Sequence, residues 1–192
     1  MEHDKQLKII AFVGLSGAGK SSAVEYVTDK GYPKVYFGGI VLHAMTEAGL
    51  EHIQENEKPF REELRIREGK DFVVNRIVTQ IQDLVVAGQH RIVADGLYTW
   101  TEYKVLKAAF PGALTVVAVV APKRVRHHRL NVRPLRPLTT DEANQRDWAE
   151  IENLEKGGPI AVADHFIMND GEREALNHQV DKILDDIHFI QT

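Results

Sequence analysis

The chain has no cysteine, no long apolar segment and no strong excess of charge of either sign. Without cysteine it can form neither a disulfide bond nor a thiolate metal site, which fits a reducing compartment. The longest apolar run, residues 113–122, is far too short to cross a bilayer. Residues 1–8 mix charges of both signs and do not resemble a secretory signal. We therefore expect a cytoplasmic protein with no membrane partner.

The net charge is −4 over 192 residues, which does not favour nucleic acid as a partner. Any site for an anionic ligand must then be built locally, against a mildly acidic whole. The length suits one domain with a full hydrophobic core, so we expect residues 1–192 to form a single unit.

Short apolar runs alternate with segments of helical periodicity along the chain. This alternation predicts a parallel sheet covered by helices on both faces, a three-layer α/β/α domain. Thr101 is the expected cap of one helix, Thr139 and Glu142 form a capping box for another, and Gly157 to Pro159 end that second helix. The charged segment 51–70 is either a helix or a lid. Strands are expected at 7–13, 34–37, 91–94, 114–121 and 165–168, and helices at 21–30, 40–49, 71–87, 101–110, 122–133, 139–155 and 172–189.

A phosphate-binding loop follows the first expected strand. The segment Gly14-Leu15-Ser16-Gly17-Ala18-Gly19-Lys20-Ser21 matches the pattern G-x-x-x-x-G-K-[ST] at every position, and Ser22 continues into the expected helix. Glycines let successive backbone N–H groups curl around one anion, and the helix N-terminus adds partial positive charge. Lys20 would reach the outer phosphates, and the Ser21 hydroxyl would bind Mg²⁺. A chance glycine-rich turn is the alternative, but the strand before the motif and the helix after it favour ATP with Mg²⁺.

Asp95 follows directly after the expected strand at 91–94. A carboxylate at that strand end would serve the magnesium ion or orient an acceptor hydroxyl. Because Asp-Gly is a common turn pair, Asp95 could instead be a turn residue. Tyr98 and Trp100, just beyond it, are equally consistent with stacking on an acceptor and with covering the core.

Arginines cluster in a segment that we expect to form a lid, approximately residues 123–140. Arg126, Arg129 and Arg133 are spaced to share one helix face, and prolines bracket the loop that follows. Guanidinium groups suit the charge of a transferring phosphoryl group, and a lid excludes water from it. Arg129 and Arg133 are therefore candidate catalytic residues, with Lys20 and Asp95. The alternative is a solvated basic face paired with the acidic stretch 141–155.

These motifs together resemble dephospho-CoA kinase, and more closely the archaeal-type dephospho-CoA-kinase-like proteins. The resemblance rests on the P-loop, Asp95-Gly96, Arg129-Leu-Asn-Val-Arg133, the stretch 63–69 and the stretch 163–171. It covers most of the chain and implies the nucleotide-kinase P-loop fold, with a central five-stranded parallel sheet and a small arginine lid. It also implies that Asn169 and Gly171 lie near the adenine, and that the acceptor side includes a helical segment at 39–70.

The acceptor side departs from its relatives at two places. Adenylate-kinase relatives carry Gly-Asp and then arginine after the second strand, whereas this chain has Gly38-Gly39 and, at the arginine position, Leu42. Tyr98 stands where the related group has an arginine. The arginines that could substitute are Arg61, Arg65, Arg67 and Arg76.

An ATP-dependent phosphotransferase acting on a small acceptor is the function that this pattern favours. The chain is small for an oligomeric motor and lacks the Asn-Lys-x-Asp segment with which GTPases read the base. A nucleotide-binding switch or slow ATPase that acts through a protein partner is the second hypothesis. A nucleic-acid-end kinase is the third, and the net negative charge disfavours it.

Overall fold

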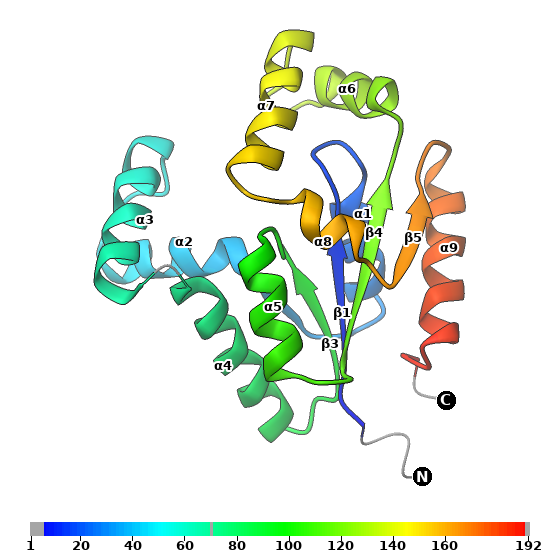
Figure 1. Ribbon diagram of the computed structural model, residues 1–192, viewed down its shortest axis with the longest axis horizontal. Coiled ribbons are helices and arrows are strands. Elements are labelled where there is room, and N and C mark those ends of the chain that lie inside the picture. Colours follow the sequence, from blue (N-terminus) through cyan, green and yellow to red (C-terminus); the bar gives the residue numbers. More distant parts are fainter. Residues whose placement is uncertain (1–5, 70, 191–192) are drawn as a thin grey trace.

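The computed structural model describes residues 6–69 and 71–190. Over these residues five parallel strands form one sheet in the order β2-β3-β1-β4-β5 (Figure 1). This confirms the expected parallel sheet. The strands are β1 Lys8–Val13, β2 Lys34–Tyr36, β3 Arg91–Asp95, β4 Leu114–Val120 and β5 His165–Met168.

Strand β1 lies at the centre of the sheet and divides the core into two. Ile9, Ala11 and Val13 face one apolar cluster, while Ile10 and Phe12 face the other, as the alternation of side chains along a strand requires. The first cluster is covered mainly by α2, α4 and α5, and the second by α1 and α9. Three layers result. These helices are α1 Lys20–Thr28, α2 Phe37–Glu47, α4 Phe72–Val86, α5 Trp100–Ala109 and α9 Arg173–Asp186.

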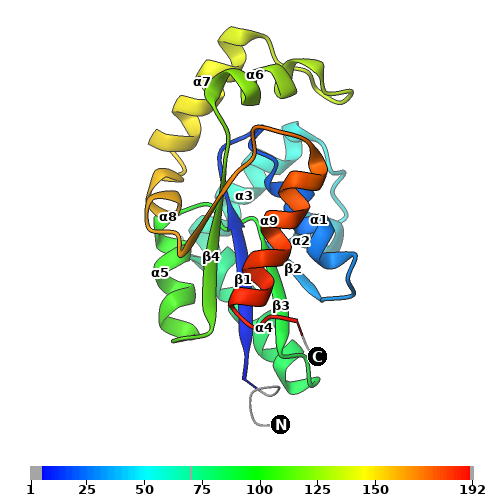
Figure 2. The same cartoon turned by 90° about the vertical axis from the view of Figure 1, so that its right-hand side faces the viewer.

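Two groups of helices extend beyond the three layers. The charged segment after residue 51 forms α3, Gln54–Glu68, which lies to one side of the sheet beyond α2 (Figure 1). Helices α6, Lys123–Val132, and α7, Thr140–Glu152, cross above the carboxyl ends of the strands (Figure 2). The short helix α8, Gly157–Ala161, follows α7 and returns the chain toward α5. None of the helices within the described residues is long and apolar enough to span a bilayer.

Several helix boundaries differ from the sequence expectation; α2, for example, begins at Phe37, within the expected strand 34–37, rather than at residue 40. Helix α5 is capped by Thr99 rather than Thr101, because the Thr99 hydroxyl accepts from the Glu102 amide and the Glu102 carboxylate accepts from the Thr99 amide. The expected box of Thr139 and Glu142 is confirmed. Gly157 and Gly158, which were expected to end the preceding helix, instead form the start of α8.

Candidate nucleotide and acceptor site

A cleft of about 770 Å³ opens at the carboxyl ends of the strands. It is lined by the P-loop and by parts of α2, α3, α6 and α7, and it is far more basic than the molecule as a whole. Its described lining carries two carboxylates, Glu102 and Glu150, against seven cationic side chains. These are Lys20, Arg61, Arg65, Arg129, Arg133, Arg146 and Lys156. The local positive charge that a phosphate site needs is therefore present.

The predicted P-loop residues take the conformation that the motif requires. Gly17 and Gly19 have φ of +80° and +97°, in the left-handed region that favours glycine, and α1 begins at Lys20. Gly14, Leu15, Ser16, Gly17, Gly19, Lys20, Ser21 and Ser22 all line the cleft. Ala18 is buried beneath them, and its carbonyl accepts a 2.7 Å hydrogen bond from the Asn169 side chain. Asn169 thus supports the loop from below.

Asp95 ends β3, beside β1, and is almost buried. One of its carboxylate oxygens lies 2.5 Å from Lys20 Nζ, and the other lies 3.8 Å from Lys34 Nζ. The pairing of Asp95 with the P-loop lysine fits a role in the site better than a turn residue. A hydroxyl at Ser21 and a carboxylate at Asp95 also fit Mg²⁺, which usually takes one or two protein oxygens together with phosphate and water.

Ser16 is held through three of its polar groups by side chains from α6 and α7. Its amide donates to Glu150 Oε2 at 3.0 Å, its hydroxyl donates to Glu150 Oε1 at 2.6 Å, and its carbonyl accepts from Arg126 at 3.1 Å. Arg126 is itself buried and forms two hydrogen bonds with Asp147, at 2.6 and 2.8 Å. These contacts join both helices to the P-loop.

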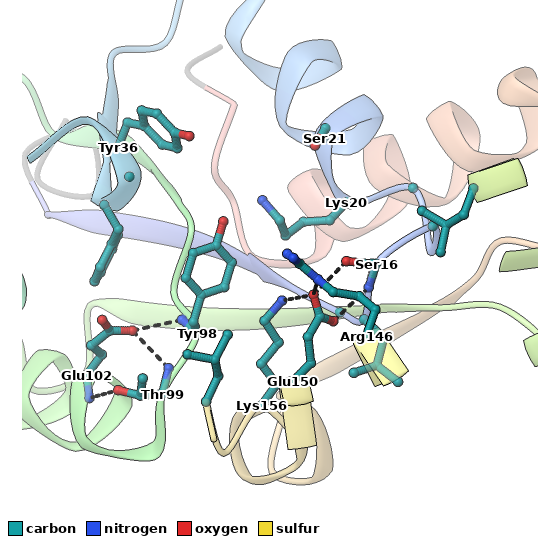
Figure 3. A pocket seen from close by; sticks show the side chains of 18 of the residues that line it. Ser16, Lys20, Ser21, Tyr36, Tyr98, Thr99, Glu102, Arg146, Glu150 and Lys156 are labelled. Carbon is teal, nitrogen blue, oxygen red and sulfur yellow. Dashed lines mark hydrogen bonds and ion pairs between the residues drawn. The ribbon is translucent and has the colours of Figure 1, made fainter. Parts of the chain in front are cut away.

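Glu150 is the centre of a buried polar cluster that sequence reasoning missed. It is 1% exposed, and its Oε1 lies 2.9 Å from both Arg146 Nε and Lys156 Nζ (Figure 3). Burial opposes the ionisation of Glu150, but Lys156 and Ser16 outweigh it, so the pKa of this carboxyl is lowered. Glu150 and Ser16 are 134 positions apart, and nothing in the sequence around either residue marks the other.

The lid arginines do not all face the cleft. Arg126 pairs with Asp147, which lies in the acidic stretch 141–155. For this arginine the alternative interpretation, pairing with the acidic stretch, is therefore correct. Arg129 and Arg133 do line the cleft. Arg129 donates to the carbonyls of Asn169, at 2.9 Å, and Gly171, at 3.3 Å, which links α6 to the loop after β5. Neither Asn169 nor Gly171 is part of the cleft lining, but both contact residues that are.

Beyond the P-loop the cleft is lined by two tyrosines, Tyr36 and Tyr98, and by two arginines of α3. Tyr36 lies against the first turn of α2, where a Cβ on Gly38 would approach its hydroxyl to 2.5 Å. A Cβ on Gly39, which stands where the relatives carry aspartate, would lie 3.0 Å from the Tyr36 ring, so glycine at both positions makes room for this ring. The Tyr98 ring stands in the cleft below Lys20 (Figure 3). Its burial, and then the charge of Asp95, raise the pKa of the Tyr98 phenol to about 12, so the hydroxyl stays neutral.

Four arginines were considered as replacements for the arginines that the relatives carry, and only two of them reach this cleft. Arg61 and Arg65 line it. Arg67 and Arg76 lie at a separate hollow and pair with Glu63 and Glu68. The choice between these arginines was left open by the sequence, because all four lie in or beside one highly charged segment.

Known proteins of similar sequence cover nearly the whole chain. Over 182 residues it is 34% identical to a UPF0200 protein of Thermococcus kodakarensis, a match covering 93% of this chain and 97% of the relative. A UPF0200 protein of Thermococcus gammatolerans is 33% identical over the same length, covering 93% and 95%. The chain belongs to the UPF0200 family. A scan against family models found no match.

Solved structures similar to this UPF0200 protein include small-molecule kinases. Shikimate kinase from Acinetobacter baumannii superposes with a TM-score of 0.61 at 21% identity, covering 97% of this chain and 96% of that one. Dephospho-CoA kinase from Campylobacter jejuni gives a TM-score of 0.54 at 16% identity, covering 94% and 97%. At these identities the likeness concerns the fold, which is the three-layer P-loop kinase fold that the sequence predicted.

Proposed function

We propose that this UPF0200 protein is an ATP-dependent phosphotransferase of the dephospho-CoA-kinase type. It transfers the γ-phosphoryl group of ATP to a hydroxyl or phosphate of a small, nucleotide-like acceptor. The observation that carries the proposal is the complete P-loop, with Lys20 paired to Asp95, at the edge of a strongly basic cleft. The cleft continues past this pair to two tyrosines and two arginines, where an acceptor has room to bind.

Each residue then has a defined task. The P-loop amides and Lys20 hold the phosphates, and binding of ATP frees Asp95 from Lys20 so that its carboxylate faces the acceptor hydroxyl and accepts its proton or orients it. Arg129 and Arg133 stabilise the charge that develops on the transferring group. Ser21 and Asp95 would hold Mg²⁺, which supplies charge neutralisation between the phosphates when bound. Asn169 and Gly171 lie beside the adenine.

The acceptor side would recognise an anionic acceptor. Arg61 and Arg65 provide charge for a phosphate or carboxylate, and the Tyr36 and Tyr98 rings provide flat surfaces for the remainder of the molecule. Glu102 is half-buried, and its carboxylate completes the capping box of α5 by accepting from the Tyr98 and Thr99 amides, so we assign it to the structure rather than to acceptor binding.

A steady-state screen of ATP consumption against phosphorylated and nucleotide-like small molecules tests the function. We expect one small molecule to stimulate consumption strongly, and Lys20→Ala to abolish the stimulation while the variant remains folded. Stimulation only by a protein would support the nucleotide switch instead. An active Lys20→Ala variant would contradict the P-loop assignment altogether.

A further inference from the structure

Lys156 lines the same cleft as Lys20, although it belongs to neither the P-loop nor the arginine lid. Its side chain is almost fully buried, and its Nζ sits 4.5 Å from the centre of the Tyr98 ring (Figure 3). Lys20 Nζ lies 5.8 Å from the centre of the same ring. The two ammonium groups therefore approach one aromatic side chain within the same cleft.

Each of these two lysines also pairs with a carboxylate. Lys20 pairs with Asp95, and Lys156 pairs with Glu150. Glu150 also accepts from Arg146, whose side chain is 56% exposed, so the buried part of this cluster is the pair of Lys156 and Glu150. Lys156, unlike Arg146, is buried, so little water solvates its ammonium group, and a phosphate that enters the cleft would give it a second anionic partner.

The backbone around Lys156 is held by contacts with α7 and α5. Its amide donates to the Glu150 carbonyl at 3.1 Å, and α8 begins directly after it. Gly158 packs against Trp100 of α5 so closely that a Cβ would lie 2.8 Å from the indole ring. The lysine is consequently held in place before any ligand arrives, as preorganised electrostatic stabilisation requires.

We infer that Lys156 is a second phosphoryl-binding lysine, which contacts the γ-phosphoryl group of ATP from the side opposite Lys20. Glu150 positions it and ties it to Ser16 of the P-loop. This inference rests on the proposed function and adds a residue to its chemistry. Burial and the nearby charges of Arg146 and Lys20 lower the pKa of Lys156 against the pull of Glu150, and an incoming phosphate would relieve this strain on the charged form.

The test compares a triphosphate with a diphosphate, because only the former carries the group that Lys156 would contact. Binding of a non-hydrolysable ATP analogue and of ADP is measured by calorimetry for the parent, Lys156→Met and Lys156→Arg. We expect Lys156→Met to weaken the ATP analogue by about tenfold or more and ADP by less than about twofold. Lys156→Arg should retain most of the preference. Lys104→Met, at an exposed position of α5, is the matched control.

The possible results separate the role of Lys156 from the proposed function of the whole cleft. Equal losses for both nucleotides, or none, would overturn the role of Lys156 while leaving the P-loop assignment intact. A parent protein that binds neither nucleotide would instead contradict the proposed function. If Lys156→Met fails to fold because Glu150 is left underpaired, the double variant Lys156→Met/Glu150→Gln removes that charge, and the same loss of triphosphate preference is expected of it.

Discussion

The two sides of the cleft are built with very different rigidity. On the nucleotide side, Ser16, Arg126, Asp147 and Glu150 form a buried network that joins the P-loop to α6 and α7. On the acceptor side, the arginines project from α3, a charged helix whose one fully buried side chain among those described is Leu64. Phosphoryl transfer needs donors held in place before the reaction, whereas acceptor binding tolerates a surface that adjusts. The sequence of each side reflects this difference.

The largest effect should come from Asp95, where the two sides meet. Asp95→Asn is expected to lower kcat by about a hundredfold or more, since it removes the carboxylate that faces the acceptor. ATP affinity should fall far less than kcat, because the loss of one proposed Mg²⁺ ligand is offset as Lys20 loses its competing partner. Steady-state kinetics with the acceptor and calorimetry with ATP measure the two quantities. A loss in kcat below about threefold would mean that Asp95 is only a structural turn residue. Asp186→Asn, at the exposed end of α9, is the control.

A second prediction concerns the rigidity of the nucleotide side. Asp147→Asn should destabilise the protein by about 3 kcal/mol at pH 7, because Arg126 remains buried without its anionic partner. Burial opposes ionisation of Asp147, but hydrogen bonds from Arg126 and His127 outweigh it and lower its pKa.

The stabilisation from Asp147 is therefore fully present above the pKa of an unfolded aspartate, about 3.9, and is lost as the pH falls through the lower folded value. Denaturant unfolding from pH 3 to 7 should show the parent and Asp147→Asn converging in acid. Asp185→Asn, exposed near the end of α9, should track the parent at every pH. A difference independent of pH would exclude the ionised pair as its source.

A third prediction compares two glycines to separate the effect of backbone strain from the effect of a clash with the lid helix α6. Gly17→Ala and Gly31→Ala both place a Cβ at positive φ, at a cost of about 1–2 kcal/mol. A Cβ on Gly17 would also lie 2.6 Å from the Arg126 carbonyl oxygen, whereas one on Gly31 meets nothing within 4 Å. Gly17→Ala should therefore weaken ATP binding by about tenfold or more, and Gly31→Ala should not change it. Equal ATP affinities in the two variants would mean that the lid does not restrict the loop.

The smallest effect is expected on the acceptor side. Arg65→Met should raise KM for the acceptor by about tenfold while leaving ATP affinity unchanged. Its effect on unfolding should stay below about 1 kcal/mol, because its ion pair with Glu62 is exposed. Arg67→Met, on the same helix but outside the cleft, is the matched control. If both variants raise KM equally, α3 attracts the acceptor through the combined charge of its arginines rather than through a direct contact with Arg65.

Much of the nucleotide side was predictable because its signals are local. The P-loop motif lies within eight consecutive residues, and Asp95 follows a strand that its own apolar residues mark. Such signals can be recognised in the sequence without knowing which distant residues come into contact. The capping of α5 shows the limit even of local reasoning: Thr99 and Thr101 are both threonines near the start of the helix, and the Glu102 carboxylate selects Thr99.

The sequence by itself determined the parallel sheet, the phosphate loop and the strand end that carries Asp95, since each depends on neighbours a few residues apart. The tertiary structure alone decided which charged residues are functional partners. Within the charge-rich stretch of α7, nothing local separates Glu150 from the exposed acids beside it. Glu150 becomes buried only because α6 and α7 fold back over the strand ends and bring it to Ser16, with Lys156 following just before the next helix.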